Sequence, residues 1–129
     1  MVHRRPLAPH EAIATAPLAE RWLGAWNAHN IDSILALYAR DARHTSKRVR
    51  LLGGSEETLH GLAAIGDYFR RGLQRYPALH FEPITVSTGP HTVVIEYRRS
   101  GVDEEEPTVE LLEINADGLI VHSRVYHAS

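Results

Sequence analysis

The hydrophobic pattern of this sequence changes period near its middle, and that change restricts the possible folds more than any other feature. In the second half, the apolar residues gather in strand-length runs at residues 79–87, 92–99, 108–114 and 119–126. Turn signals separate these runs, and the last turn contains Asp117-Gly118, a strong hairpin signal between two apolar runs. The second half is therefore predicted to form an antiparallel meander.

The first half shows the period of α-helices. An apolar stripe at spacings of three and four residues predicts a helix over about residues 10–28. The stripe includes Leu18, Trp22, Ala25 and Trp26. Pro17 suits the first turn of a helix that begins near Thr15, or kinks a longer one. Asn30 is typical of the N-cap of a short second helix, whose buried side would extend to Tyr38.

The remaining segments complete an α+β pattern. We expect a strand over residues 43–52 and a third helix that follows Gly61 and stops before Pro77. Helices followed by an antiparallel meander predict an α+β domain in which the helices cover one face of the sheet. We expect residues 1–129 to form a single domain, with residues 1–8 as a loose arm.

Composition excludes several classes of function. The net charge is −2, and arginines and acidic residues are interleaved, so nothing indicates a nucleic-acid or anionic-membrane partner. There is no cysteine, which excludes disulfides, thiolate zinc sites and a cysteine nucleophile. No run approaches the ~20 apolar residues of a membrane span, and no signal-like apolar stretch follows the basic start. We therefore expect a cytoplasmic protein without a cofactor.

Three segments together resemble one protein superfamily in their order and spacing. They are residues 22–42, with the Trp-Asn-Ala-His-Asn motif at 26–30, residues 60–69 and residues 113–126. The sequence resembles an uncharacterised branch of the SnoaL-like, ketosteroid-isomerase-like (nuclear transport factor 2-like) superfamily. The resemblance implies three N-terminal helices packed on a strongly curved, mainly antiparallel sheet that forms a cone with an internal pocket. It also implies a small-molecule ligand and a homodimer formed through the sheet.

The resemblance implies which positions would carry ketosteroid-isomerase chemistry. The carboxylate base of that family falls near Ser46, and a serine has no basic pKa at neutral pH. The oxyanion-binding tyrosine corresponds to Trp22, whose indole N–H is still a donor. The supporting tyrosines correspond to Tyr38 and Phe69, and the oxyanion-binding aspartic acid corresponds to Glu110. Because the base is missing, we reject steroid isomerisation as the activity.

The epoxide-hydrolase branch of the superfamily is not favoured either. It needs a carboxylate–arginine–carboxylate set, and one of its carboxylate positions, on the last strand, holds Val125 here. The resemblance therefore implies a pocket with an apolar and aromatic wall, whose reaction is not specified by the fold. We expect that wall to contain Trp22, Trp26, Tyr38, Phe69, Leu112 and Val125.

Glu110 is the polar residue that we expect at the focus of the pocket. If the turn between the second and third runs centres near residue 103 or 104, Glu110 lies opposite Glu96 or Arg98, and these three residues share one face. A slip of one residue would instead set Tyr97 opposite Glu110. The resemblance favours the inward direction, where Glu110 pairs with Arg98 or takes up a proton. The alternative is a solvated outer face.

Two histidines are further candidates for chemistry. The nine histidines form no HExxH or comparable close pair, so no metal site is expected. His44 and His127 lie on strands that the resemblance sends along the pocket wall, where either could act as an acid or base near neutral pH. The alternative is that each is hydrogen-bonded at a strand end.

Two hypotheses of function follow. In the first, the chain is an enzyme acting on a small, largely apolar metabolite by acid/base chemistry of the isomerase, cyclase or hydrolase type. Glu110, with His44 or His127, would supply the polar groups. In the second, it is a non-catalytic ligand-binding or dimerisation module that has the pocket without the chemistry.

Overall fold

The computed structural model describes residues 9–50 and 56–127, so the predicted arm at residues 1–8 lies outside the described residues. The helices are α1 (Pro9–Asn27), α2 (Ile31–Leu35), α3 (Lys47–Arg50) and α4 (Leu62–Arg75). The strands are β1 (Tyr38–Thr45), β2 (Thr58–His60), β3 (His80–Thr88), β4 (Thr92–Ser100), β5 (Glu106–Ile114) and β6 (Ile120–His127). Within the described residues, no helix combines the length and apolar character that a membrane crossing requires.

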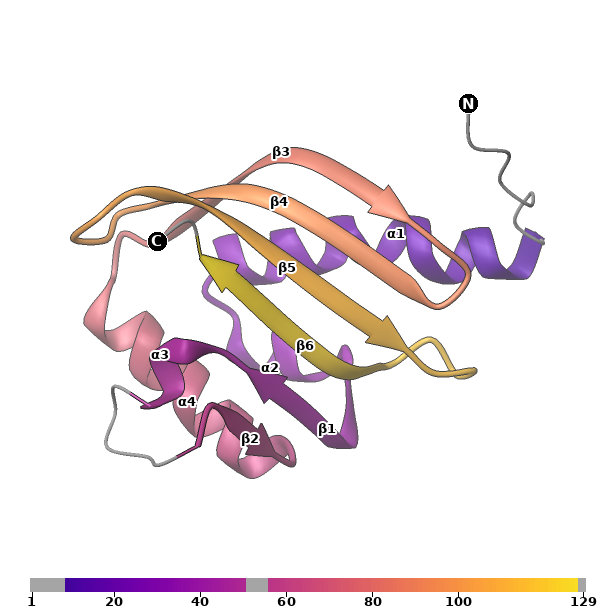
Figure 1. The fold of residues 1–129 in the computed structure, drawn as a ribbon, viewed down its shortest axis with the longest axis horizontal. Helices are drawn as coiled ribbons and strands as arrows, with labels where there is room; N and C mark the ends of the chain where they lie inside the picture. The colour runs from indigo at the N-terminus through magenta and orange to yellow at the C-terminus, as the bar shows by residue number, and fades with distance from the viewer. Residues whose placement is uncertain (1–8, 51–55, 128–129) are drawn as a thin grey trace.

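Six strands form one open sheet in the order β2-β1-β6-β5-β4-β3. β1 pairs with β6 in parallel, while the other neighbouring strands pair in antiparallel. The sheet is strongly curved, and α1, α2 and α4 lie against one of its faces (Figure 1). The predicted α+β class, with helices covering one face of a curved and mainly antiparallel sheet, is confirmed.

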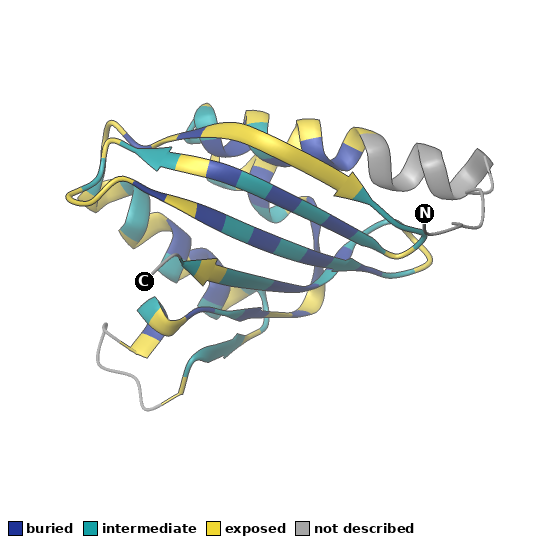
Figure 2. Cartoon of the chain, turned by 45° about the horizontal axis from the view of Figure 1, so that its top comes forward, coloured by how far each residue is buried: buried dark blue, intermediate teal, exposed yellow. Residues whose placement is uncertain are grey.

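The second half agrees closely with the sequence pattern. All four predicted strands are present, with ends within about two residues of the prediction. α4 follows Gly61 and ends before Pro77, as predicted. Buried and less buried residues alternate along β4 and β5, because one face of each strand packs on the core (Figure 2). Asn30 caps α2, since its side chain accepts a hydrogen bond from the Ser33 N–H at 3.0 Å.

The strand predicted over residues 43–52 is placed wrongly. β1 ends at Thr45, and the single helical turn α3 follows almost at once. Ser46 explains the break, because its Oγ accepts a hydrogen bond from the Arg48 N–H at 3.2 Å. A side chain that captures a nearby backbone N–H starts a turn instead of extending a strand. The end of the predicted strand, at residues 51–52, lies outside the described residues.

The core lies between the helices and the concave face of the sheet. α1 continues through Pro17, so the longer of the two predicted helices is present. Its predicted apolar stripe is buried: Leu18, Trp22, Ala25 and Trp26. Trp22 stacks on Phe81 with 5.6 Å between ring centroids, and Phe81 lies 4.3 Å from Tyr97. Each large apolar side chain buried in this way contributes roughly 1.5–3 kcal/mol, so the aromatic layer holds α1 against β3 and β4.

A glycine in the β4–β5 turn lets two parts of the backbone approach closely. Gly101 has φ +74°, and a Cβ at this position would overlap the carbonyl oxygen of Ala78. Glycine alone combines a positive φ with the absence of a Cβ. The turn therefore packs directly against the segment that leads into β3.

Candidate functional site

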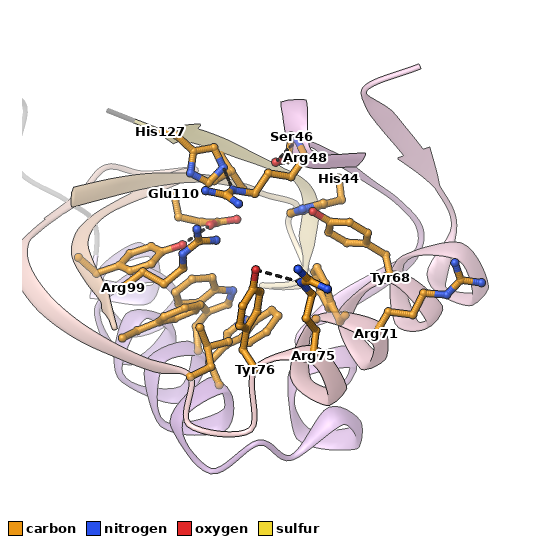
Figure 3. Close-up of a pocket in the computed structure, with 18 residues that line it drawn as sticks. His44, Ser46, Arg48, Tyr68, Arg71, Arg75, Tyr76, Arg99, Glu110 and His127 are labelled. Carbon is orange, nitrogen blue, oxygen red and sulfur yellow. Dashed lines mark hydrogen bonds between the residues drawn. The ribbon is translucent and has the colours of Figure 1, made fainter. Parts of the chain in front are cut away.

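A cavity of about 530 Å³ lies between the concave face of the sheet, α1 and α4. Its walls also include residues of α3 and of the β4, β5 and β6 strands, so it gathers side chains that are far apart in the sequence (Figure 3). Small-molecule sites typically have volumes of about 300–1,000 Å³. The cavity is therefore the candidate functional site.

Aromatic rings form one continuous side of the cavity, which we call the aromatic wall: Trp22, Trp26, Phe69 and Phe81. The centroid of Trp26 lies 4.8 Å from that of Phe69, 5.3 Å from that of Phe81 and 6.0 Å from that of Trp22. The Trp26 indole Nε1 is buried and has no hydrogen-bond partner among the described residues. A wall of this kind suits a flat or apolar molecule.

The carboxyl group of Glu110 faces the cavity from β5 (Figure 3). The residue is only 2% exposed, and Oε1 accepts a hydrogen bond from the Tyr97 hydroxyl at 3.1 Å. Burial raises the pKa of Glu110 to about 8, although the Tyr97 hydrogen bond and the charge of Arg99 act in the opposite direction. The carboxyl group is therefore mostly protonated at neutral pH. With Tyr97 bound to one oxygen, the acid can donate a hydrogen bond from the other.

The register of the β4–β5 hairpin decides which neighbours Glu110 has. Glu110 is paired with Ile95, so Tyr97 and Arg99 lie on its face of β4. Glu96 and Arg98 point to the other face; Arg98 is exposed, and Glu96 accepts a hydrogen bond from Thr85 at 3.1 Å. The prediction that placed Glu96 and Arg98 in the pocket is therefore wrong. The cause is the register, since Ile95 lies one residue from Glu96 and three residues from Arg98, and either odd shift turns the side chains to the opposite face.

A chain of hydrogen bonds leads from α1 to His44 behind the cavity wall. The Trp22 Nε1–H donates to the Tyr38 hydroxyl at 3.3 Å, and Tyr38 is hydrogen-bonded to Ser123. Ser123 Oγ lies 2.6 Å from His44 Nδ1. An indole nitrogen only donates, so the Tyr38 oxygen accepts from Trp22. The tautomer of His44 sets the direction of the bond to Ser123: when Ser123 donates to Nδ1, the imidazole proton lies on Nε2.

His44 is neutral in this environment. Burial, together with the nearby His122, lowers the pKa of His44 to about 3. The ring is 3% exposed and packs edge-on against Phe69 with 5.0 Å between centroids. A histidine this weakly basic does not take a proton near neutral pH, whereas its Nε2–H can polarise an oxygen acceptor. Figure 3 shows His44 beside Tyr68 on the cavity wall.

A second polar group, which we call the arginine cluster, consists of Arg48, Arg99, Glu106 and His127. Glu106 Oε1 lies 3.1 Å from Arg48 Nη2, 3.9 Å from Arg99 Nη2 and 2.9 Å from His127 Nδ1. Burial acts to raise the pKa of Glu106, but the Arg48 hydrogen bond, the nearby His127 and the two guanidinium charges outweigh it and lower the pKa. Burial and the same two arginines lower the pKa of His127 to about 4. His127 is therefore neutral at neutral pH and poorly suited to act as a base.

The other predicted pocket residues divide into two groups. Ser46 and Val125 line the cavity, together with Trp22, Trp26 and Phe69. Tyr38 and Leu112 do not line it, although both are buried; Tyr38 lies in the hydrogen-bond chain and Leu112 in the core. Their predicted place in the wall is corrected accordingly.

Sequence reasoning missed the polar residues Arg48, Tyr68, Tyr97 and Arg99, which all line the cavity. For Arg99 a signal was available, because it shares parity with the apolar residues Val93 and Ile95. Arg48 offered no such signal, since its position depends on α3. In the described part of the chain, no three His, Asp or Glu side chains are grouped so that they could hold a metal ion.

Comparisons with known proteins agree with this architecture. The sequence model of a family described as the SnoaL-like domain matches residues 19–123. A SnoaL-like protein of unknown function from Burkholderia thailandensis E264 is 29% identical, with a TM-score of 0.83 over 96% of this chain and 100% of that chain. No curated protein matches the sequence.

Two more distant structures share the fold. An uncharacterised cystatin-fold protein from Novosphingobium aromaticivorans is 15% identical, with a TM-score of 0.71 over 85% of this chain and 95% of that chain. A hypothetical protein with a ketosteroid-isomerase-like fold from Catenulispora acidiphila DSM 44928 was solved in complex with trimethylamine. It is 19% identical, with a TM-score of 0.71 over 87% of this chain and 85% of that chain.

Proposed function

This chain belongs to the SnoaL-like domain family, and we propose that it binds a small, largely apolar carbonyl compound in its cavity and polarises the carbonyl oxygen. The observation that carries the proposal is the Glu110 carboxyl group, which is 2% exposed and faces an aromatic cavity of about 530 Å³. Burial raises its pKa to about 8, so the group holds its proton at neutral pH. A neutral acid in an apolar site is a strong hydrogen-bond donor to a carbonyl or enolate oxygen. The trimethylamine bound to the Catenulispora acidiphila protein supports small-molecule binding by this fold.

His44 supplies a second donor in the same cavity. In this proposal the His44 Nδ1 accepts the hydrogen bond from Ser123, 2.6 Å away, and Nε2 carries the proton. Glu110 and His44 are two neutral donors that are already in position. Their hydrogen bonds can stabilise negative charge that develops on a ligand oxygen. This arrangement supports acid/base chemistry of the isomerase, cyclase or hydrolase type, with Glu110 as the acid.

A non-catalytic ligand-binding module is the second candidate, and one observation favours it. Ser46, at the position of the family's base, is 2% exposed and caps α3. His44 and His127 have lowered pKa values, of about 3 and about 4, and are weak bases. Only Glu110, with a pKa of about 8, can exchange a proton near neutral pH among these groups.

Association of two chains through the sheet remains part of the proposal. Ile84 and Val86 on β3 and Tyr126 on β6 are large apolar residues that are 50%, 44% and 54% exposed. Exposed apolar residues on a sheet favour pairing with a second surface. Light scattering that gives the mass of a monomer at micromolar concentration would contradict dimerisation.

The carbonyl hypothesis can be tested with a matched pair of ligands. We expect 2-acetylnaphthalene to bind more tightly than 2-ethylnaphthalene, which has the same shape without the carbonyl oxygen. One neutral hydrogen bond contributes about 0.5–1.5 kcal/mol, or roughly a three- to tenfold difference in Kd. Glu110→Leu should reduce this preference, whereas Glu104→Gln, in the exposed β4–β5 turn, should retain it in full. Titration calorimetry measures both affinities.

The same ligands separate the two candidate functions. If Glu110→Leu keeps the full preference for the ketone, Glu110 is not the carbonyl donor and the proposal is wrong. Deuterium exchange at the ketone methyl group, followed by NMR, then tests for chemistry. Exchange that is faster with the wild type than with Glu110→Leu supports an enzyme, while tight binding without faster exchange supports the non-catalytic module.

A further inference from the structure

The arginine cluster holds more positive than negative charge. Arg48 and Arg99 both line the cavity, and both point to the same oxygen of Glu106. Their side chains are 31% and 12% exposed, so neither guanidinium is freely solvated. At neutral pH Glu106 carries one negative charge, while His127 and Glu110 are neutral because of their shifted pKa values. Two positive charges therefore face one negative charge.

The other charged groups around the cavity do not compensate the cluster. Arg71 and Arg75 on α4 also line the cavity, but each already has an acidic partner. Arg71 lies 3.2 Å from Asp67, and Arg75 lies 3.8 Å from Asp103. Among the described residues that line the cavity, Glu110 is the remaining carboxyl group, and it holds its proton. The excess positive charge stays with Arg48 and Arg99.

Arg99 shows the consequence of this imbalance most directly. Its Nε is buried and has no hydrogen-bond partner among the described residues. Burial and the charge of Arg48 both lower the pKa of Arg99, as expected when two guanidinium groups are held close together. A guanidinium group presents several N–H donors in a plane and binds carboxylate, sulfonate or phosphate oxygens strongly. An anion placed here would restore the charge balance.

We propose that the ligand is an organic anion whose acidic group is bound by Arg48 and Arg99 while its apolar body lies against the aromatic wall. This inference rests on the proposed function, because it assigns a ligand class to the same cavity. Glu106 holds the two arginines in place when no ligand is bound. The aromatic wall and the arginine cluster together select an apolar or aromatic acid over a neutral molecule of the same shape.

Two fluorescent probes that differ only in an acidic group test the proposal. 8-Anilino-1-naphthalenesulfonate carries a sulfonate, and N-phenyl-1-naphthylamine is the same ring system without it. Both should bind the wild-type protein. Arg99→Gln and Arg48→Gln should each weaken binding of the sulfonate probe about tenfold, because a hydrogen bond to a charged group is lost. They should change the affinity of the neutral probe by less than about twofold, and added salt should weaken only the sulfonate probe.

Three further variants serve as controls for the loss of charge, for folding and for the place where the probes bind. Arg98→Gln removes the same charge from the neighbouring residue on the opposite face of β4, so it should leave both affinities unchanged. Arg99→Lys keeps the charge and should retain most of the sulfonate affinity, even if Arg99→Gln fails to fold by circular dichroism. Val125→Phe reduces the volume of the cavity and should weaken both probes.

The outcomes distinguish the two proposals. If neither probe binds the wild type, or if Val125→Phe weakens neither, the cavity does not bind small molecules and the proposed function fails. If both probes bind in the cavity but the arginine variants weaken them equally or not at all, the anion site is wrong and the apolar pocket remains. Selective loss of the sulfonate probe in Arg99→Gln and Arg48→Gln, with no loss in Arg98→Gln, supports the anion site.

Discussion

Replacing Glu110 by glutamine should change the way in which the stability of the fold depends on pH. The buried carboxyl group has a folded-state pKa of about 8, compared with 4.5 when unperturbed. Between these values the folded chain holds a proton that the unfolded chain releases. The free energy of unfolding therefore falls as pH rises through this window, because unfolding is increasingly coupled to proton release.

The size of this effect follows from the shift in the Glu110 pKa. Each pKa unit corresponds to about 1.36 kcal/mol, so the wild type should lose about 3 kcal/mol through Glu110 between about pH 5 and pH 8. Two buried histidines change the free energy of unfolding in the opposite direction at lower pH. His44 and His127 have folded-state pKa values of about 3 and about 4. They take up protons on unfolding below about pH 6.5, so their contribution to stability rises with pH up to that point.

Comparison with Glu110→Gln isolates the carboxyl group from these other titrations. Glutamine has nearly the same shape but does not titrate, so the histidine contributions cancel in the difference between variant and wild type. The difference in unfolding free energy, measured by urea denaturation at several pH values, should shift by about 3 kcal/mol in favour of the variant from about pH 5 to pH 8. Glu104→Gln, in the exposed turn, should show no such shift. A pH-independent difference for Glu110→Gln would refute a protonated Glu110 at neutral pH and, with it, the carbonyl donor.

Two further predictions test the site and the fold. Long-range ¹H–¹⁵N NMR correlations should show His44 protonated on Nε2 and unprotonated on Nδ1 from about pH 5 to pH 8. Ser123→Ala should remove this preference for the Nε2–H tautomer. A proton on Nδ1 in the wild type would contradict the proposed role of His44 as a donor. Gly101→Ala should destabilise the fold by at least about 2 kcal/mol in urea denaturation, because it adds a Cβ against Ala78 to the strain of a positive φ. Gly118→Ala is its control, since Gly118 has φ +80° with no atom within 4 Å of an added Cβ, and equal losses in both variants would show that the contact with Ala78 contributes nothing.

The strands and long helices could be predicted from the sequence because their signals are local. β5 alternates in burial and is joined to β6 by a turn that contains Asp117-Gly118, and α4 lies between Gly61 and Pro77. The direction of the β4 side chains could not be predicted in the same way. Val93 and Ile95 share the parity of Arg99, but Val94 is apolar on the other face, so this signal is weaker than those of the turns and helix ends. A turn that differs by one residue exchanges the two faces of the strand.

Ser46, which ends β1 earlier than predicted, also positions part of the site. The resemblance of the sequence to ketosteroid isomerase sets Ser46 against the base of that enzyme, and the Ser46 hydroxyl ends β1 by capping α3. The turn that follows carries Arg48 back to the cavity, where it meets Glu106 across a separation of 58 residues. A carboxylate in place of Ser46 would add a negative charge close to Arg48 and could neutralise the excess positive charge of the cluster. In the proposed anion site, a serine at position 46 therefore has two effects: this position carries no base, and no carboxylate competes with the ligand for Arg48.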